Sequence, residues 1–201
     1  MKEIKVSIHQ PEYLPYRGHF FKISQADIHI FLDDVQAERN AGAGNGWQYR
    51  NKFPDGYHNA PKKKIHLGDK INEVQVPEMG MSLADWNIPL ITTISRELGY
   101  KTIFLRSSLL DIGEFDGPND RLVKLVKSVG GTSYIAGSGG HNYMDFSYFE
   151  KACLKLYFME FEEEDYLSTF WHIQNEGCKA VADYIKTHGK LTPVNYADLK
   201  I

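Results

Sequence analysis

The sequence has little cysteine, no long apolar run and a small net charge, and each of these excludes a class of protein. Its 201 residues contain two cysteines, Cys153 and Cys178, too few for the disulfide framework of a small secreted domain. No stretch approaches the roughly 20 apolar residues of a membrane-spanning helix. The first apolar run is broken by His9, Gln10 and Pro11 and does not read as a signal peptide. We therefore expect a cytoplasmic protein without a membrane span.

The charge balance gives no reason to expect a polyanionic partner. Lysine and arginine number 23 and aspartate and glutamate 26, a formal net charge of -3, so nucleic acid is not an expected ligand. With 42% apolar and 24% charged residues, the composition is that of a globular protein. A chain of this length buries roughly 70% of its unfolded surface, enough for a core without disulfides or metal. We expect a single domain over residues 1–201.

The N-terminal pattern predicts a strand, a helical crossover and a second strand. Residues 4–8 form a short β-rich run, residues 20–24 suit one or two helical turns, and residues 28–32 (IHIFL) are continuously apolar. Strands that are apolar on both faces are typical of a covered parallel sheet. The predicted fold class is therefore α/β, with a mainly parallel central sheet flanked by helices.

A hairpin insertion is predicted at about residues 47–67. The segments WQYRNKF and HNAPKKKIHLG flank a Pro-Asp-Gly turn at residues 54–56. The lysine run at residues 62–64 is typical of a solvated sheet edge, with phosphate binding as the alternative. Residues 37–46, rich in glycine, asparagine and alanine, are expected to form a loop, either a plain surface loop or a lid.

The rest of the chain alternates between helical and strand patterns. Residues 82–98 predict a helix capped by Ser82, although Asn87 could instead cap a shorter helix with Pro89 in its first turn. A helix that follows Pro118 and ends at Gly130 is next. The remaining expected elements are a strand at 133–136, a helix at about 146–152, a strand at 154–161 and helical residues over 168–188.

Three polar clusters each begin where an apolar strand ends. They are His9 with Gln10, Asp33 with Asp34, and the segment Gly137, Ser138, Gly139, Gly140 and His141. In an open parallel sheet, ligands bind outside the carboxyl ends of the strands. If the three strands are parallel neighbours, the clusters converge on one pocket.

Each cluster also has an ordinary structural interpretation. His9 could be a buried histidine bonded to a turn, although histidine is the side chain best suited to proton transfer near neutral pH. Asp33 and Asp34 could be turn caps, or could orient a histidine, bind a metal or accept sugar hydroxyls. The glycine segment could be a simple turn or a cradle for an anion. It has neither the dinucleotide fingerprint nor the Walker lysine.

The histidine and cysteine spacings do not predict a zinc site. The eight histidines include no His-x-x-x-His pair on a helix, and there is no Cys-x-x-Cys, so no metal ligand is assigned. Magnesium at Asp33 or Asp34 stays an alternative, because it prefers hard oxygen ligands. The aromatic residues Tyr13, Tyr16 and Trp47 could stack on a sugar or base, or simply pack.

Several of these segments resemble the WbqC-like proteins. The first block is IHQPEYLPYRGHFFKISQADIHIFLDDVQ followed by WQYRNKF, and the later blocks are YIAGSGGHNYMD and YLSTFWHIQNEG. The residues that match the family's shared motifs are His9, Gln10, Tyr13, Asp33, Asp34, Gln36, Arg50 and Asn51. Residues 40–46 and the pair Trp171 and His172 depart from the pattern, which bears on whether the usual family substrate is shared.

The resemblance implies a role in bacterial surface-polysaccharide synthesis, in particular of the O-antigen of lipopolysaccharide, beside sugar aminotransferases. It favours a transferase that modifies a nucleotide-linked amino sugar by N-acyl or aminoacyl transfer. The donor would be an acyl thioester of coenzyme A or a carrier protein, and no cofactor is specified. His9, oriented by Asp33 or Asp34, would act as the base. Gln10, Tyr13, Gln36, Arg50, Asn51 and residues 138–141 would bind substrate.

Two other functions stay open. Tyr16, Arg17, Gly18 and His19 open a helix after a proline-containing loop and faintly resemble the His-x-Gly-His motif of nucleotidyltransferases, which use a nucleoside triphosphate and magnesium. A non-catalytic sugar-binding or scaffolding partner of a biosynthetic enzyme would explain the lack of a strong catalytic signature.

Overall fold

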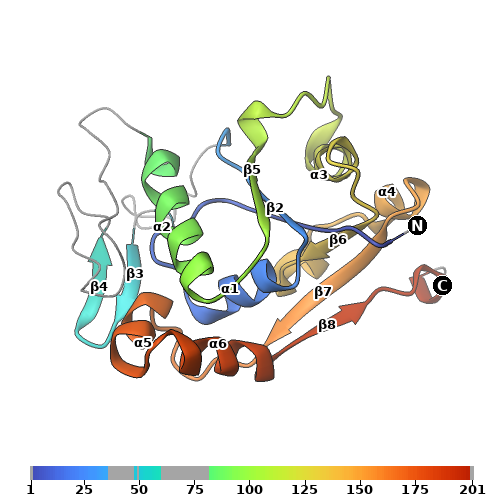
Figure 1. Cartoon of the computed structure of the whole chain (residues 1–201). Helices are drawn as coiled ribbons and strands as arrows, with labels where there is room; N and C mark the ends of the chain where they lie inside the picture. Colours follow the sequence, from blue (N-terminus) through green and yellow to red (C-terminus); the bar gives the residue numbers. More distant parts are fainter. Residues whose placement is uncertain (1, 36–47, 49, 60–81, 200–201) are drawn as a thin grey trace.

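The computed structural model describes the chain except for residues 1, 36–47, 49, 60–81 and 200–201 (Figure 1). Gln36, the glycine-rich stretch at 40–46 and the lysine run at 62–64 therefore lie outside the described residues. So does the part of the hairpin prediction that covers residues 60–67.

Six strands of the described chain form one sheet in the order β5-β2-β1-β6-β7-β8. They are β1 (Lys5–His9), β2 (Ile28–Phe31), β5 (Ile103–Arg106), β6 (Ser133–Ala136), β7 (Lys155–Phe161) and β8 (Gly189–Pro193). The first five of that spatial order pair in parallel, and β8 runs antiparallel to β7. The predicted α/β class with a mainly parallel sheet is confirmed.

Strand β1 occupies the middle of the sheet. Its Val6 lies opposite Ile28 of β2 on one side and opposite Tyr134 of β6 on the other. The chain therefore leaves β1 towards β2 and β5, and later returns to the other side of β1 to form β6. The strand order reverses at this point, and in open α/β sheets the ligand crevice lies at such a reversal.

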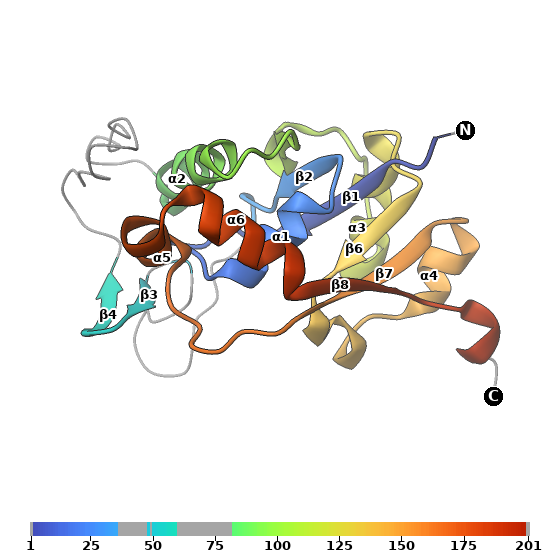
Figure 2. The same ribbon diagram turned by 60° about the horizontal axis from the view of Figure 1, so that its bottom comes forward.

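Helices cover both faces of the sheet (Figures 1 and 2). One face carries α1 (Arg17–Ser24), α2 (Leu83–Glu97), α5 (Thr169–Glu176) and α6 (Cys178–Thr187), and the other carries α3 (Gly117–Ser128) and α4 (Phe146–Lys151). Adjacent residues of a strand point to opposite faces of the sheet, and each face has its own hydrophobic core. Ile135 packs with Phe20 in the core below α1, whereas Tyr134 packs with Phe149 in the core below α4. The two apolar faces explain why the strands are continuously apolar in sequence.

Helix α2 begins where its capping signal lies. The Ser82 hydroxyl accepts from the Asp85 amide, and the Asp85 carboxylate accepts from the Ser82 amide, a reciprocal capping box. Pro89 is inside the helix, so the alternative start at Asn87 is wrong. The buried Asn87 side chain instead donates to the carbonyl oxygens of Pro11 and Gln48, at 2.9 and 2.8 Å. It thereby ties the loop after β1 to α2.

Three features of the fold differ from the sequence prediction. The helical stretch at 168–188 is two helices, separated at Gly177 with φ of 84°, a conformation that favours glycine. Strands β5 and β8 were not predicted. Strand β8 (GKLTP) contains glycine and proline and has low intrinsic strand propensity, so its pairing with β7 determines its conformation.

The predicted hairpin is present as a separate two-stranded sheet. Strand β3 (Arg50–Phe53) pairs antiparallel with β4 (Gly56–Asn59), with Phe53 opposite Gly56 across the turn. Figure 1 shows it at the far side of α2 from the central sheet. Short 3-10 helices follow three strands of the central sheet: η1 (Ser107–Leu109) follows β5, η2 (Ser138–Asn142) follows β6 and η3 (Tyr196–Leu199) follows β8.

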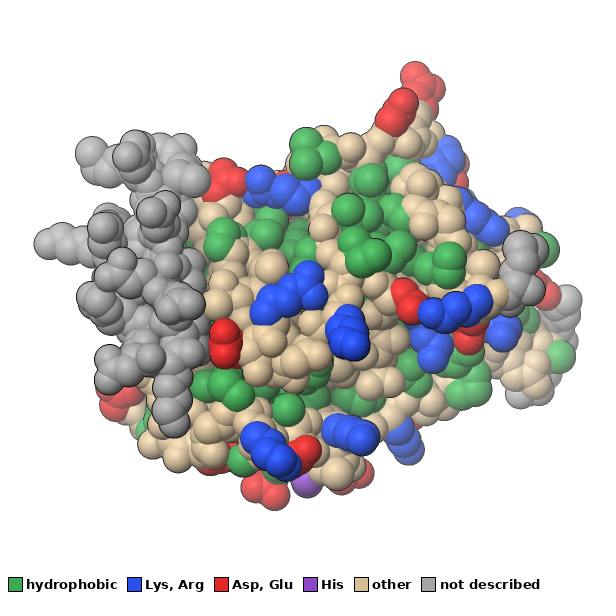
Figure 3. All heavy atoms as spheres, viewed as in Figure 1, with side chains coloured by type: hydrophobic (Ala, Val, Ile, Leu, Met, Phe, Trp, Pro, Cys, Tyr) green, Lys and Arg blue, Asp and Glu red, His purple; other side chains and the backbone are tan. Residues whose placement is uncertain are grey.

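The surface carries mixed charge. In Figure 3, acidic side chains lie beside basic ones at several places on the described part of this face. Among the described residues, no helix has the length and apolar character needed to span a membrane.

Candidate functional site

A cavity of about 570 Å³ lies at the carboxyl ends of β1 and β6. The loop after β1 supplies His9, Gln10, Glu12 and Tyr16, and α1 supplies His19 and Lys22. Residues 137–140 and Arg121 of α3 line the opposite side. Because β1 and β6 pair in parallel, the polar segments after these two strands meet here, as the sequence predicted. The third predicted cluster, Asp33 with Asp34 after β2, does not line the cavity.

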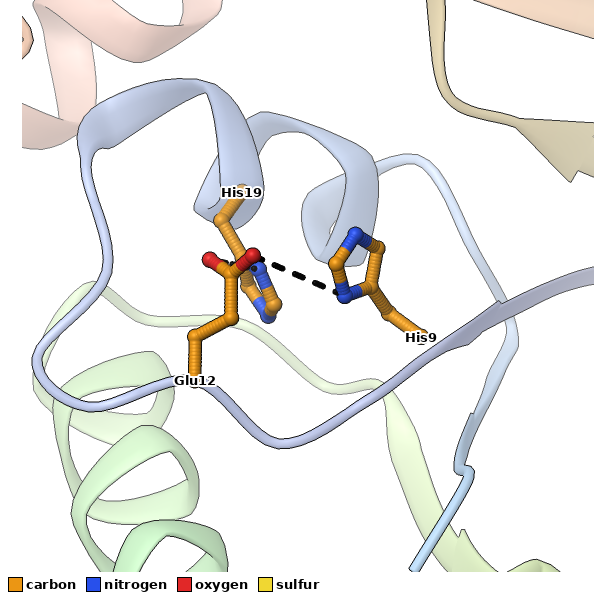
Figure 4. Close-up of side chains that lie close together, drawn as sticks. All are labelled: His9, Glu12 and His19. Atoms are coloured by element: carbon orange, nitrogen blue, oxygen red, sulfur yellow. Dashed lines mark hydrogen bonds and ion pairs between the residues drawn. The ribbon is translucent and has the colours of Figure 1, made fainter. Parts of the chain in front are cut away.

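His9, Glu12 and His19 form a tight cluster in this cavity (Figure 4). The Glu12 carboxylate lies between the two imidazoles: its Oε2 is 3.2 Å from His19 Nδ1, and its Oε1 is 3.9 Å from His9 Nδ1. The His19 side chain is 2% exposed and that of Glu12 11%, whereas His9 is 36% exposed. The cluster is thus covered on the protein side and reaches solvent at His9.

The local chain path brings these three side chains together. His9 is the last residue of β1, and the following loop contains Pro11, which cannot continue the strand ladder. Tyr16 is the N-cap residue of α1, in extended conformation, so His19 falls in the first turn of the helix. The first turn of α1 therefore lies beside the end of β1, with the rings of His19 and His9 4.9 Å apart.

Lys22 lies one turn further along α1 and also faces the cavity. Its Nζ donates to the carbonyl oxygen of Ile8, at 2.8 Å, which fixes the ammonium group beside the end of β1. Burial lowers the pKa of Lys22 to about 8, and the opposing attraction of Glu12 only partly offsets this. A lysine with this pKa is neutral in part of its population just above neutral pH.

The pKa values of His9 and Glu12 favour a neutral His9 beside an ionised carboxylate. Burial lowers the pKa of His9 to about 4, which Glu12 opposes and Lys22 and His19 reinforce. Burial alone would raise the pKa of Glu12, but His9, His19 and Lys22 outweigh it and lower that pKa. At neutral pH His9 is therefore neutral. Its Nδ1–H donates to the Gln10 carbonyl oxygen at 3.0 Å, which leaves the lone pair of Nε2 to bind a ligand.

One nitrogen of His19 has no hydrogen-bond partner among the described residues. This atom, Nε2, is buried, and the other ring nitrogen contacts Glu12. His29, on β2, has the same feature, because its Nδ1 contacts Ser7 Oγ at 2.7 Å and its Nε2 has no described partner. An unpaired buried polar atom costs about 1–3 kcal/mol. His19 lines the cavity and His29 does not, so the unpaired nitrogen of His19 is the one that indicates where a ligand would be bound.

The carboxylate that faces His9 belongs to Glu12, and not to Asp33 or Asp34. Asp33 Oδ2 lies 2.8 Å from Nε of Arg106, and its carboxylate also accepts from Ser108. These contacts occupy Asp33 beyond the end of β2. The suggested orientation of His9 by Asp33 is not what the structure shows.

Asp34 acts on the cavity through an arginine. Its Oδ1 lies 2.5 Å from Nη2 of Arg121 and 2.5 Å from the Ser107 hydroxyl. Arg121 lines the cavity, and its Nε is buried without a hydrogen-bond partner among the described residues. Asp34 is thus a positioning residue for Arg121 and does not orient His9.

The glycine segment after β6 presents two different glycines to the cavity. A Cβ on Gly140 would meet Met144 Sδ and Phe158 Cε1, both at 2.8 Å, whereas a Cβ on Gly139 would meet nothing within 4 Å. Gly140 is therefore required for packing. Gly139 leaves room for a ligand to approach the backbone. Ser138 also lines the cavity, but the His141 ring stacks on Phe158 with centroids 3.5 Å apart and is not a lining residue.

The other residues expected to bind substrate are divided between the cavity and the hairpin. Gln10 lines the cavity, where its Oε1 accepts from Gln48 Nε2 at 2.5 Å. Tyr13 and Asn51 are buried, with Asn51 Nδ2 donating to the Tyr13 carbonyl oxygen at 3.2 Å. The Arg50 guanidinium stacks over Tyr57 on the hairpin, at 4.3 Å from the ring centroid. Tyr13, Arg50 and Asn51 are not lining residues of the cavity.

Sequence reasoning missed Glu12, Lys22 and Arg121. Glu12 and Lys22 carried a signal that went unused: both are charged residues within otherwise apolar stretches, Glu12 in PEYLP and Lys22 in FFKI. A charged residue in a segment that packs against the core is rarely buried without a partner or a function. Arg121 carried no such signal, because α3 has several charged residues.

A family model of WbqC-like proteins matches residues 10–79 and 57–172. The chain belongs to the WbqC-like protein family. The match takes in the loop after β1, α1, α3 and the glycine segment, so the cavity is built from family residues. His9 lies one residue before the matched region.

A mycobacterial protein is similar to this chain over most of its length. The "Uncharacterized protein Rv1507c" of Mycobacterium tuberculosis (strain ATCC 25618 / H37Rv) is 23% identical over 193 residues, which cover 79% of this chain and 83% of that protein. No solved structure matches the chain significantly.

Proposed function

We propose that this WbqC-like protein is a cytoplasmic transferase that modifies a nucleotide-linked amino sugar, by N-acyl or aminoacyl transfer, in bacterial surface-polysaccharide biosynthesis. One observation carries the proposal. A single cavity at the reversal point of the sheet has a histidine–carboxylate cluster on one side and an arginine with a glycine segment on the other. The first side suits proton transfer, and the second suits a phosphate-bearing substrate.

The nucleotide diphosphate would bind on the side of Arg121 and Gly139. The buried Nε–H of Arg121 has no described partner, and a phosphate oxygen would accept it. Gly139 has open space where a side chain would stand, so phosphate can approach the backbone amides closely. The sugar would then extend towards Gln10 and the cluster on the opposite side of the cavity.

The cluster would remove the proton that prevents the sugar amine from reacting. An ammonium group becomes a nucleophile only when it loses a proton, and the cluster of His9, Glu12 and His19 is the proton acceptor in this cavity. The free amine attacks the donor's thioester carbonyl, so that a nitrogen–carbon bond forms and the carbon–sulfur bond breaks. The amine's second proton goes to the leaving thiolate, which departs as a thiol.

Turnover of a nucleotide-linked amino sugar with a panel of acyl thioesters tests the proposal. Glu12→Gln should lower turnover by roughly 10²–10⁴-fold, because it removes the charge that supports proton transfer. His58→Asn is the control: His58 pairs with Asp55, three residues earlier, on the exposed hairpin. Equal turnover for both variants would refute the assigned role. Binding of the sugar nucleotide without any turnover would replace the transferase with a non-catalytic sugar-binding partner.

Nucleotidyl transfer is a second candidate, favoured by the position of the two histidines. The rings of His9 and His19 lie 4.9 Å apart at the start of α1, where the helix dipole favours anions. A nucleoside triphosphate bound there would be held by both imidazoles. Thermal unfolding distinguishes the two candidates. A magnesium nucleoside triphosphate alone would raise the unfolding midpoint under the second, and an amino-sugar nucleotide under the first.

A further inference from the structure

The cluster of His9, Glu12 and His19 combines two imidazoles with one carboxylate at the edge of a cavity. One potential ligand atom of each side chain lies within 4.8 Å of the others. We propose that these three residues bind one divalent transition-metal ion of the zinc type, with a coordination position directed towards the cavity. Figure 4 shows the carboxylate of Glu12 beside the ring of His19, with the ring of His9 next to both.

The donor set fits zinc better than magnesium or calcium. Imidazole nitrogen suits zinc and its first-row neighbours, whereas magnesium and calcium prefer all-oxygen sites. Two histidines and one glutamate leave one of four tetrahedral positions for water or substrate, which is the pattern of catalytic zinc sites. The magnesium alternative at Asp33 and Asp34 is not supported, because Arg106 and Arg121 already pair with those carboxylates.

The spacing is close to what a tetrahedral ion requires. Ligand atoms about 2.1 Å from zinc lie roughly 3.4 Å from one another. The two imidazole-to-carboxylate distances here are 3.2 and 3.9 Å. Side-chain rotations would bring the three donors onto one ion, and for His9 this would replace the 3.0 Å contact of Nδ1 with the Gln10 carbonyl oxygen.

Burial gives a second, independent indication of a ligand. His19 is 4% exposed, and its Nε2 has no hydrogen-bond partner among the described residues. Its one hydrogen bond goes to Glu12. The protein thus places a polar ring in its interior beside a cavity with Glu12 as its one described hydrogen-bond partner. An ion would bind Nδ1, the nitrogen that faces Glu12, and a water in the cavity would accept from Nε2–H.

The charge of the cluster also suits a cation. A metal ion binds histidine as neutral imidazole and glutamate as carboxylate, so the three ligands would together carry one negative charge. Lys22 is the opposing group, because it faces the same cavity. Removing its charge should therefore tighten metal binding, a result that a purely structural lysine would not give.

A metal at this position would deepen the proposed transferase chemistry without depending on it. Zinc lowers the pKa of its bound water to about 7, and the resulting hydroxide would accept the proton of the sugar ammonium and become water. His9, Glu12 and His19 would then act as ligands, and the base would be the metal-bound hydroxide. Metal binding is measured without substrate, so failure of either proposal is recognised separately.

The test is a zinc titration of the chelator-treated full chain, produced without a histidine tag, in competition with a chromophoric chelator. We expect one equivalent bound. Glu12→Gln and His19→Ala should each weaken affinity by more than about 100-fold, since even outer-shell partners are worth 10–100-fold. His58→Asn, from the exposed His58–Asp55 pair, should bind as the unaltered protein does. Cobalt should give the visible absorption of a low-symmetry site.

Two results would overturn the proposal. One is the absence of a stoichiometric site in the unaltered protein, and the other is equal affinity in Glu12→Gln, a near-isosteric change whose folding is checked by circular dichroism. Lys22→Gln keeps a donor for the Ile8 carbonyl and removes the charge, so it should raise zinc affinity. Unchanged or weaker binding by a folded Lys22→Gln protein would count against a metal between these three residues.

Discussion

Two regions of this protein combine histidine with carboxylates, but they differ in how completely the charges are paired. In the first, Glu12 lies between His9 and His19 beside the cavity, and one nitrogen of His19 has no described partner. In the second, which we call the Arg17 cluster, the buried Arg17 pairs with Glu163 at 2.5 Å and with Asp165 at 3.6 Å.

The Arg17 cluster has no unused imidazole nitrogen. Its His172 contacts Asp165 through Nε2 at 3.3 Å and Glu176 through Nδ1 at 2.7 Å. The guanidinium of Arg17 also stacks over Tyr184, 3.8 Å from the ring centroid. A permanent cation and full pairing make this cluster a structural joint between α1, α5 and the end of β7. The cluster at the cavity lacks both, which is why we assign function to it.

The largest effect is expected from breaking the Arg17 cluster. Arg17→Ala leaves Glu163 buried without its partner, and removal of one member of a buried pair costs about 3–5 kcal/mol. Urea unfolding should show that loss in the free energy of unfolding. Lys179→Ala, which breaks the exposed pair with Asp183, is the control and should cost less than about 1 kcal/mol. Equal losses in the two variants would show that the cluster is not a joint.

A smaller effect is expected at the glycine segment. Gly140→Ala places a methyl group 2.8 Å from Met144 and Phe158, and such overpacking costs about 1–3 kcal/mol. Gly139→Ala meets no protein atom and should leave the free energy of unfolding unchanged. Under the proposed function it should still weaken binding of a sugar nucleotide, measured by calorimetry. If Gly139→Ala binds normally, phosphate does not approach that backbone.

A substitution in the cluster at the cavity should change stability little and function strongly, the reverse of a substitution in the Arg17 cluster. Glu12→Gln is near-isosteric and keeps an acceptor for His19, so the free energy of unfolding should change by no more than about 1 kcal/mol. Activity and metal binding should fall strongly in the same variant. A loss of stability comparable to that of Arg17→Ala would place Glu12 among the structural residues.

The smallest effect concerns pH and Asp34. Burial alone would raise the pKa of Asp34, but hydrogen bonds from Ser107 and Arg121 outweigh it and hold that pKa below its ordinary value of 3.8. The group therefore contributes stability above that value and loses it as the pH falls through the lower folded-state pKa. Asp34→Asn should be less stable than the unaltered protein at pH 7, by under about 1 kcal/mol, and this difference should disappear in strong acid. Urea unfolding at both pH values measures it.

The central part of the fold could be predicted because its signals are local. The apolar runs of β1 and β2, the capping serine of α2 and the turn of the hairpin each specify an element within a few residues. Strand β8 could not be predicted in this way, since its conformation depends on β7. Gly177 was present in the sequence, but the left-handed conformation that ends α5 depends on how α6 packs.

The site was predicted in its location and only partly in its residues. The convergence of His9 with the glycine segment follows from the carboxyl ends of parallel strands, a property of the topology. The carboxylate partner of His9 does not follow from the topology, because it depends on the path of the loop after β1. Asp33 and Asp34 were the nearer candidates in the predicted sheet, but arginines from β5 and α3 pair with them. Sequence spacing carries no information on such long-range pairs.

The position of β1 between β2 and β6 has a consequence for protein synthesis. The residues of the cluster lie between β1 and the first turn of α1, so they leave the ribosome well before β6. The strand that completes their cavity, β6, begins at residue 133, and the glycine segment follows it. A nascent or truncated chain that ends before β6 therefore displays two histidines and a glutamate with nothing opposite them. Under the proposed function, a nucleotide diphosphate can therefore bind only after Arg121 and the glycine segment have been made.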